Sequence, residues 1–494
     1  MRLRDPRDKL QKEIDAELCF LRGQLAQESG SRSRTAPVLA DAVGESSIIS
    51  ARLDAVLSSA SWRSASWLRA LLDAAKLAPK KIIGSIIAPK KPVQAASGPL
   101  RVLMVGHALD LTGAPHSQFE MAIGLKRRKF ADPVILSTAD GPLKHWYESS
   151  DIEVRVVDPP LANIGSLLDY RRRIAAIGEL FSKLQISVVH ANTLQTFWAV
   201  DAAASAGLPA IWNVRESESW QTYFDWLPRA LRGRAYACFE NAWRVVFVSN
   251  ATRQAWAPIE RNDNFTVVHN GLDLRAFDDR LSELDRGQAR RRIAAQHADV
   301  VIVLVGTVTE RKGQLDLVRA AALLPAELAK RCQIYMVGDR PSPYSDQLHR
   351  EAAELPSCWG NRLHTVPETD AVPAYLRAAD IAVCSSRIES YPRVILEEMA
   401  ASLPIVTTPV FGIVEQVRAG ENALIYQPED VSELAGALTR LIKSPDLRDR
   451  MGERSRILLQ QLTSYEQMLE QYAALFYEAC GKQTPKRDTP CAGS

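Results

Sequence analysis

Residues 381–400, IAVCSSRIESYPRVILEEMA, decide the fold, because a short apolar run leads through a polar loop into an amphipathic segment. This order predicts a β-strand, a loop and an α-helix, which form the repeating unit of a parallel sheet. We expect Pro392 in the first turn of the helix and Ser390 as its N-cap. The backbone N–H groups of residues 391–394 would then favour an anion above the ends of the strands.

Two glutamates of this stretch, Glu389 in the loop and Glu397 eight residues later, are placed to reach different hydroxyl groups of one ligand. Carboxylates suit this task because they accept strong hydrogen bonds. Two glutamates alone are more often surface residues of a solvated helix. The pair therefore needs a second signal from elsewhere in the chain.

That second signal is residues 301–314, VIVLVGTVTERKGQ, which predict another strand, a loop and a helix that begins near Gly313. Lys312 would lie just before this helix, where its ammonium group could meet a diphosphate. Arg311 could add a bidentate contact. A solvated basic turn is the alternative for this segment taken alone.

Similar apolar runs alternate with helical patterns from residue 100 onward. The candidate strands are residues 101–105, 133–137, 153–157, 187–190, 209–214, 245–248, 265–268, 300–305, 333–337, 362–366, 381–384, 405–407 and 423–426. Strands of this kind indicate parallel sheets that are covered on both faces. Because so many strands rarely share one sheet, we predict an α/β fold with two doubly wound, Rossmann-like domains that face a cleft.

The predicted parts of the chain are a helical extension and linker at 1–98, a first domain at 99–256, a second domain at 257–440, helices at 441–480 and a disordered tail at 481–494. In this division the strand at 265–268 opens the second sheet. The last of the C-terminal helices is expected to pack back on the first domain.

Composition excludes several classes of protein. The net charge of +3 is too small to make nucleic acid the main partner. The seven cysteines form no C-x-x-C pair, which favours reduced thiols over a disulfide framework or a zinc site. The charged N-terminus leads into no long apolar run, so neither a signal peptide nor a membrane-spanning helix is predicted. We expect a cytoplasmic protein.

The two strand–loop–helix segments resemble the family 4 retaining glycosyltransferases, which have the two-domain GT-B fold. The resemblance is based on two motifs, E-x7-E at Glu389 and Glu397 and G-x5-K-G at Gly306, Lys312 and Gly313. Shorter pieces follow in the expected order: VSNAT at 248–252, HNGLD at 269–273, MVGD at 336–339, AADIAV at 378–383, LPIVTT at 403–408, VFGIVEQV at 410–417 and GENALIY at 420–426. The resemblance covers roughly residues 100–480.

The resemblance implies that Glu389 holds the donor sugar, Glu397 binds the ribose and Lys312 neutralises the diphosphate. Thr307 stands where the family often has an arginine, so that one phosphate contact is missing or passes to Arg311. The predicted donor-binding residues are Gly113, Thr307, Arg311, Lys312, Glu389, Ser390, Tyr391, Pro392, Arg393, Val394 and Glu397. No metal and no cofactor is predicted, since the substrate itself is a nucleotide diphosphate sugar.

The first domain carries weaker signals. Residues 105–117, VGHALDLTGAPHS, resemble the glycine loop of the family, in which the backbone of Gly113 could approach the donor closely. An ordinary β–α turn is the alternative. We predict His190 as a catalytic residue beside Glu389 and Lys312, and His116, Asn192 and Arg215 as acceptor-binding residues. Arg215 replaces a histidine that family members often carry, and His190 and Arg215 could equally be structural.

Within the N-terminal extension, residues 61–91 hold seven lysines and arginines against one acid, Asp73. Tryptophan and leucine recur at helical spacing, which suits a helix on an anionic membrane surface. The segment SWRSASWLR at 61–69 also resembles an element ahead of some bacterial envelope polysaccharide glycosyltransferases. Peripheral attachment to the inner face of the membrane and docking on the enzyme itself or on a partner protein both stay open.

These parts predict a retaining enzyme that moves a hexosyl group from a nucleotide diphosphate sugar to a saccharide or lipid-linked saccharide acceptor, by analogy in cell-envelope polysaccharide synthesis. In the family, attack from the front face needs no protein nucleophile. The alternatives are a GT-B phosphorylase, which would need a lysine for a pyridoxal cofactor, and a nucleotide-sugar epimerase. A nicotinamide dehydrogenase would need G-x-G-x-x-G, which the glycine loop lacks, and a silent scaffold would not need Lys312 and both glutamates.

Overall fold

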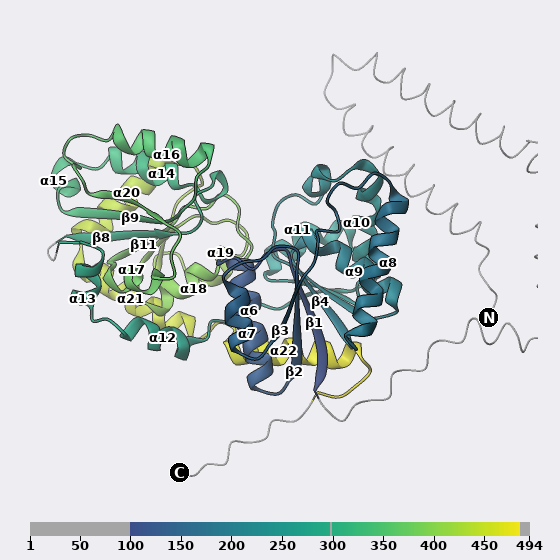
Figure 1. Ribbon diagram of the computed structural model, residues 1–494. Coiled ribbons are helices and arrows are strands. Elements are labelled where there is room, and N and C mark those ends of the chain that lie inside the picture. Colours follow the sequence, from purple (N-terminus) through teal and green to yellow (C-terminus); the bar gives the residue numbers. More distant parts are fainter. Residues whose placement is uncertain (1–98, 297–298, 485–494) are drawn as a thin grey trace, which may run out of the picture. The chain divides into compact units, whose positions relative to one another are not determined.

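The computed structural model describes residues 99–296 and 299–484, which belong to one compact unit that holds two parallel sheets. The predictions for the N-terminal extension, including its membrane contact, lie outside the described residues, as does most of the predicted tail. The described chain alternates strands with helices throughout (Figure 1). The predicted α/β class with two Rossmann-like domains is confirmed.

The first sheet has seven strands in the order β3-β2-β1-β4-β5-β6-β7, and all its paired strands are parallel. The strands are β1 (Leu100–Gly106), β2 (Ala131–Ser137), β3 (Glu153–Val156), β4 (Val188–Asn192), β5 (Ala210–Val214), β6 (Arg244–Phe247) and β7 (Phe265–Val267). The intervening helices are α6 (Gly113–Arg127), α7 (Leu143–Ser149), α8 (Leu167–Lys183), α9 (Phe197–Ala206), α10 (Arg229–Asn241) and α11 (Asn250–Trp256), with short 3-10 turns η1 (Leu194–Thr196), η2 (Tyr223–Trp226) and η3 (Ala257–Ile259). Separate hydrophobic clusters cover the two faces of this sheet.

The second sheet has six strands in the order β10-β9-β8-β11-β12-β13, again parallel. They are β8 (Val300–Val305), β9 (Cys332–Asp339), β10 (Leu363–Pro367), β11 (Ile381–Cys384), β12 (Ile405–Thr407) and β13 (Ala423–Ile425). The helices of this domain are α12 (Leu274–Ser282), α13 (Arg286–Arg292), α14 (Gln314–Ala322), α15 (Ala326–Ala329), α16 (Pro343–Ala353), α17 (Val372–Ala378), α18 (Arg393–Ala400), α19 (Ile413–Gln416), α20 (Val431–Lys443) and α21 (Pro445–Leu459), with the 3-10 turn η4 (Glu310–Lys312).

Strand β7 corrects one prediction. The strand at 265–268 was expected to open the second sheet, but β7 pairs with β6 and completes the first. The physical reason is that α11 turns the chain back to the open edge of β6, where the N–H and C=O groups of an unpaired strand would otherwise remain free. The change from one sheet to the other therefore falls after Val267.

Both sheets reverse their strand order beside a central strand, β1 in the first sheet and β8 in the second. The loops on either side of such a strand turn in opposite directions and leave a crevice outside the carboxyl ends of the strands. The loops after β1, β4, β8 and β11 therefore frame the place where a ligand is expected.

The last described helix, α22 (Tyr465–Ala479), packs on α6, β1 and β5 of the first domain, although α20 and α21 pack on the second. Its apolar side shares one hydrophobic cluster with β1, through residues such as Leu469, Tyr472 and Phe476. A capping box of Ser464 and Gln467 begins the helix. Figure 1 shows α22 beside the strands of the first sheet.

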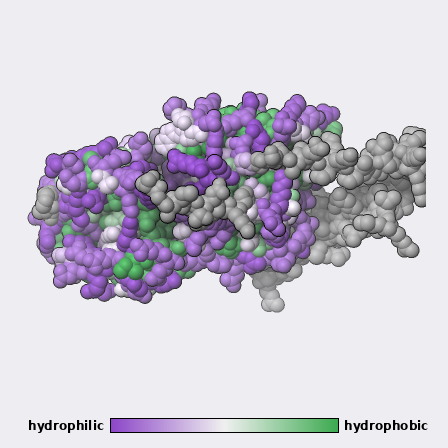
Figure 2. Space-filling view, turned by 90° about the horizontal axis from the view of Figure 1, so that it is seen from below, coloured by the Kyte–Doolittle hydropathy of each residue, from purple (hydrophilic) through white to green (hydrophobic). Residues whose placement is uncertain are grey.

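The surface is mainly polar on the face shown in Figure 2, where apolar side chains appear only as scattered patches. The apolar residues of the strands lie instead in the buried clusters of the two domains. Among the helices of the described residues, none is long and apolar enough to cross a membrane.

Candidate active site

A cavity of about 640 Å³ lies between the loops of the two sheets, a size in the usual range for small-molecule sites. Residues after β1, β4 and β5 contribute to one wall, and residues at the end of β9 and after β8, β10 and β11 contribute to the other. All the residues predicted to bind the donor line this cavity, as do His116 and Arg215. Asn192 and His190 are not among the lining residues.

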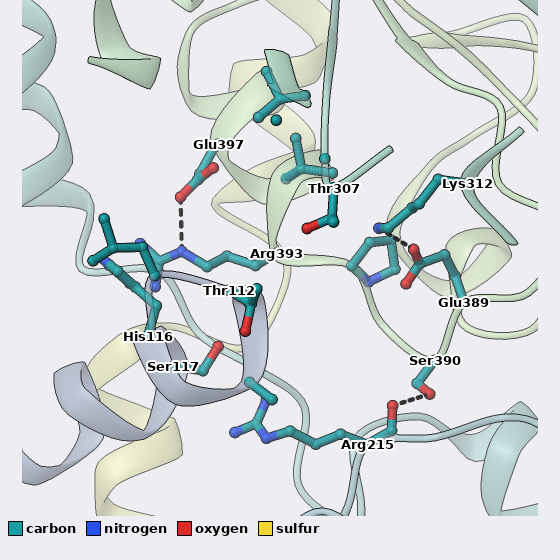
Figure 3. A pocket seen from close by; sticks show the side chains of 18 of the residues that line it. Thr112, His116, Ser117, Arg215, Thr307, Lys312, Glu389, Ser390, Arg393 and Glu397 are labelled. Carbon is teal, nitrogen blue, oxygen red and sulfur yellow. Dashed lines mark hydrogen bonds and ion pairs between the residues drawn. The ribbon is translucent and has the colours of Figure 1, made fainter. Parts of the chain in front are cut away.

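Lys312 and Glu389 meet on one side of the cavity (Figure 3). The Nζ of Lys312 donates to Oε1 of Glu389, and Nη1 of Arg311 lies 3.2 Å from the same oxygen. Glu389 is only 7% exposed. Burial by itself would raise the pKa of Glu389, but Lys312 and Arg311 outweigh it and hold that pKa below its ordinary value. The carboxylate is therefore ionised and already faces two cations.

The loop geometry explains why these two side chains meet. Gly313 has φ of +67°, and a Cβ at this position would lie 2.3 Å from the carbonyl oxygen of Ser385. Only glycine permits both the backbone conformation and this close approach. The hydroxyl of Ser385 also donates to the carbonyl oxygens of Lys312 and Gly313, at 2.9 and 3.0 Å. The loops after β8 and β11 are thus tied together at their bases.

Helix α18 begins at Arg393, with Pro392 at the N-cap position and no side-chain cap. The prediction that Ser390 is the N-cap is wrong, because it lies two residues too early in the chain. Its hydroxyl instead donates to the carbonyl oxygen of Arg215 at 2.6 Å and lies 2.7 Å from the hydroxyl of Ser217. Ser390 therefore connects the loop after β11 to the first domain.

Glu397 lies at the other side of the cavity, one helical turn after Arg393 (Figure 3). The Nε of Arg393 donates to Oε1 of Glu397 at 2.7 Å. The two terminal nitrogens of Arg393 reach Glu120 on α6, in the first domain. Glu120 was not predicted as a site residue, because a single acid within an amphipathic helix carries no signal by itself.

The N-terminus of α6 forms part of the first-domain wall. Gly113 begins this helix, and a Cβ built there would meet no atom within 4 Å. The residue is exposed to the cavity rather than packed against protein. One turn later, burial and the neighbouring Arg393 lower the pKa of His116 to about 4, so that its imidazole is neutral at pH 7.

Arg215 reaches the cavity from the end of β5. Its Nε donates to Asn192 at 2.7 Å, and its Nη1 donates to Asn270 at 3.0 Å. Burial lowers the pKa of Arg215 below its ordinary value. Asn192 was predicted to bind the acceptor, but the structure places it behind Arg215, where its amide nitrogen donates to the carbonyl oxygen of Ala114. The side chain of Asn192 therefore positions Arg215 by accepting its hydrogen bond.

His190 does not reach the cavity. The side chain is fully buried and stacks edge-on against Tyr472 and Phe476 of α22, with ring centroids 5.6 and 6.0 Å apart. Burial and the nearby Arg215 lower the pKa of His190 to about 3. The prediction that His190 lies at the catalytic site is therefore wrong, because its side chain does not line the cavity. Strand β4 continues two residues beyond His190, and alternation along the strand points its ring at α22.

Glu216 and Thr193 are among the cavity residues of the first domain that were not predicted. The carboxylate of Glu216 accepts N–H bonds from Leu194 at 3.0 Å and from Arg215 at 2.9 Å, and burial raises its pKa to about 7. Thr193 has φ of +80°, a conformation that strains a β-branched residue. Glu216 directly follows Arg215 in the chain, but the burial that raises the pKa of Glu216 depends on the fold and not on the neighbouring sequence.

Among the described residues, no cluster of histidine, cysteine, aspartate or glutamate has the arrangement of a metal site. The cavity contains cations and carboxylates on both walls, with backbone N–H groups at the start of α6 and α18. Two Rossmann-like domains around such a cavity define the architecture of a GT-B glycosyltransferase.

Comparison with protein families supports this class and narrows it. A model described as "Glycosyltransferase Family 4" matches residues 112–276, and one described as "Glycosyl transferases group 1" matches residues 285–457. The chain belongs to glycosyltransferase family 4.

The curated proteins that are similar in sequence to this chain include named glycosyltransferases. The D-inositol 3-phosphate glycosyltransferase of Salinispora arenicola is 31% identical over 226 residues, which are 42% of this chain and 49% of that protein. The lipopolysaccharide core biosynthesis glycosyltransferase LpsE of Rhizobium meliloti is 31% identical over 175 residues, 35% of this chain and 49% of that protein. The chain spans about half the length of the curated relatives it matches.

Among solved structures, the Anabaena protein HepE in complex with UDP-glucose superposes with a TM-score of 0.65 at 20% identity. The superposition covers 77% of this chain and all of that one. At this identity the likeness establishes the shared fold.

Proposed function

We propose that this protein transfers a hexosyl group from a nucleotide diphosphate sugar to a saccharide or lipid-linked saccharide, with retention of the anomeric configuration. The observation that carries the proposal is the contact of Lys312 and Arg311 with the buried carboxylate of Glu389, in the cavity that Glu397 also lines. A cation pair beside two carboxylates suits a ligand that carries both phosphates and sugar hydroxyls.

In this proposal the diphosphate of the donor lies by Lys312 and Arg311, near the start of α6. The open space above Gly113 leaves room for a phosphate against backbone N–H groups, which a helix N-terminus favours. Glu389 accepts hydrogen bonds from the donor sugar, and Glu397 accepts them from the ribose. Arg311 takes the phosphate contact that Thr307 cannot make.

The reaction follows from this placement. The bond between the anomeric carbon and the diphosphate oxygen breaks, and the hydroxyl oxygen of the acceptor forms the new bond on the same face of the sugar. The proton of the acceptor hydroxyl moves to the departing phosphate oxygen. Lys312 and Arg311 stabilise the negative charge that develops there, so the contribution of the protein is positioning and electrostatic stabilisation.

Three further features belong to the proposal. The diphosphate is neutralised by protein cations, and activity in EDTA should equal activity with added Mg²⁺. The acceptor belongs to a cell-envelope polysaccharide, which the similarity to LpsE supports. The enzyme works in the cytoplasm, with residues 61–91 as a candidate contact to the inner face of the membrane.

A panel of UDP-, GDP-, ADP- and dTDP-sugars in thermal-shift experiments tests the proposal first. A donor that binds the folded state raises its stability by RT ln(1 + [L]/Kd), about 2.7 kcal/mol at a hundredfold excess over Kd. The preferred donor is then incubated with acceptor saccharides, and the anomeric configuration of the product is determined by NMR. No stabilisation by any donor, or an inverted product, would contradict the proposal.

A further inference from the structure

Arg393 is partly buried between two carboxylates that come from different domains. Its Nε donates to Glu397 on its own helix at 2.7 Å. Its Nη2 donates to Oε1 of Glu120 on α6 at 2.8 Å, and its Nη1 donates to Oε2 of the same carboxylate. The guanidinium therefore makes a two-pronged contact across the cavity with one domain and a single contact within the other.

Glu120 and Arg393 are charged although both side chains are largely removed from solvent. Burial alone would raise the pKa of Glu120, but Arg393 outweighs it and lowers that pKa. Burial would likewise lower the pKa of Arg393, and the two glutamates raise it instead. The neutral imidazole of His116 lies 3.9 Å from Glu120 and adds no full charge. A buried charge in such a network is costly to leave alone, so removal of one member disturbs the others.

The backbone of Glu120 is also anchored. The hydroxyl of Tyr465, the first residue of α22, donates to the carbonyl oxygen of Glu120 at 2.5 Å. Glu120 is thus a fixed point of the first domain. Arg393 is the first residue of α18, and Glu397 lies four residues later on the same side of the helix. A single guanidinium therefore links the fixed point on α6 to the carboxylate of Glu397.

We propose that Glu120 and Arg393 are positioning residues that hold Glu397 in place for the nucleotide and couple its position to the approach of the two domains. The inference rests on the proposed function, in which Glu397 binds the ribose. Arg393 occupies one oxygen of Glu397 and leaves the other to accept from a hydroxyl. Separation of the domains removes Glu120 from Arg393 and releases the constraint on Glu397, so the nucleotide favours the closed arrangement.

The test compares the affinity for nucleotides of the full-length wild type with that of Glu120→Gln, Glu397→Gln and the double variant, by isothermal titration calorimetry. The probe is whichever of UDP, GDP or ADP binds the wild type most tightly. We expect Glu120→Gln to raise Kd about tenfold in the wild type and less than about twofold in the Glu397→Gln background. Glu120 does not touch the nucleotide in this proposal, so only action through Glu397 gives this non-additivity.

The matched control is Glu351→Gln. Arg319 donates to both oxygens of Glu351 at 2.8 Å, a two-pronged pair that lies within the second domain and does not line the cavity. Loss of this pair should leave the nucleotide Kd unchanged. Arg393→Lys gives a second approach, because an ammonium group cannot present the same planar fork to Glu120 and still reach Glu397. It should weaken nucleotide binding as Glu120→Gln does.

An unchanged Kd in Glu120→Gln, or the same loss in both backgrounds, overturns the inference while the proposed function stands. A wild type that binds none of the three nucleotides overturns both. Thermal melts of each variant show whether it is folded. If Glu120→Gln does not fold, Arg393→Lys is measured in its place with the same two backgrounds and the same criteria.

Discussion

On the second-domain wall of the cavity, each conspicuous carboxylate faces a cation. Glu389 contacts Lys312, and Glu397 contacts Arg393. On the first-domain wall, Arg215 is instead held by the amide oxygens of two asparagines, and its neighbour Glu216 by backbone N–H groups. Glu389 and Glu397 are thus paired with cations of their own domain, whereas Arg215 and Glu216 are supported by neutral groups.

This difference determines which existing contacts a ligand must replace when it binds to each wall. A wall whose cations and carboxylates are already paired must exchange an internal contact for a ligand contact, which suits a donor that brings phosphates and hydroxyls together. On the first-domain wall, where neutral amide and backbone groups hold the charged side chains, a ligand can contact those side chains without breaking an ion pair. Four experiments can break or sharpen this comparison.

The largest effect is expected for Lys312→Ala, which removes the cation beside Glu389. In the proposed function the variant loses a charge-assisted contact to the diphosphate, and it leaves the buried carboxylate of Glu389 with Arg311 as its remaining cation. We expect kcat/KM to fall at least about tenfold, equal to about 1.4 kcal/mol of transition-state stabilisation. Arg311→Ala is the comparison variant and should lose less, because the side chain of Arg311 is 41% exposed and that of Lys312 only 17%. Wild-type turnover in Lys312→Ala would contradict a role of Lys312 in binding the diphosphate.

The largest effect on stability, rather than on activity, is expected in a contrast between two glycines, one from each wall. Gly313→Ala combines a positive φ with a clash against the backbone of Ser385, and should lower the free energy of unfolding by about 2 kcal/mol. Gly113→Ala meets open space and should leave the melting temperature unchanged, yet weaken donor binding. Thermal melts and donor titrations separate the two results, and equal loss of stability in both variants would contradict the structure.

A smaller effect is expected at Glu398, which is fully buried behind Glu397 and has no hydrogen-bond partner for either oxygen within the described structure. Burial and the charge of Glu397 raise its pKa well above the ordinary value. Because the folded state holds this proton, stability falls as pH rises above the unfolded-state pKa of about 4.5. Glu398→Met should therefore raise the melting temperature, by more at pH 8 than at pH 5. A constant difference between these pH values would show that Glu398 is not protonated.

The smallest effect is expected for Glu216→Gln on the first-domain wall. The carboxyl group binds its proton more tightly in the folded state, so it lowers stability as pH rises from about 4.5 to about 7, and no further above that. The amide can still accept the N–H bonds and stays neutral. The melting temperature of the variant relative to wild type should rise through this window, and a pH-independent difference would contradict the raised pKa.

The second-domain wall could be predicted from sequence because its residues lie in two contiguous strand–loop–helix segments. Lys312, Glu389 and Glu397 were all identified, and all three line the cavity. Ser390 was assigned a helix-capping role because the start of α18 was expected two residues too early. That error is local, and it leaves the wall intact.

The first-domain wall was harder, because its geometry depends on contacts between distant segments. His190 was expected at the cavity, but its side chain points at α22, a helix that follows it by more than 270 residues in the chain. Glu120 and Glu216 were not selected at all, since their importance comes from burial and from partners on other elements. Residue letters and spacing do not contain that information.

Helix α22 also constrains the order in which the chain matures on the ribosome. The first domain is synthesised before the second, but one face of its sheet is completed by Leu469, Tyr472 and Phe476. Until those residues leave the exit tunnel, a nascent first domain exposes an apolar surface that invites aggregation or chaperone binding. Final assembly of the earlier domain must therefore wait for translation of the later one.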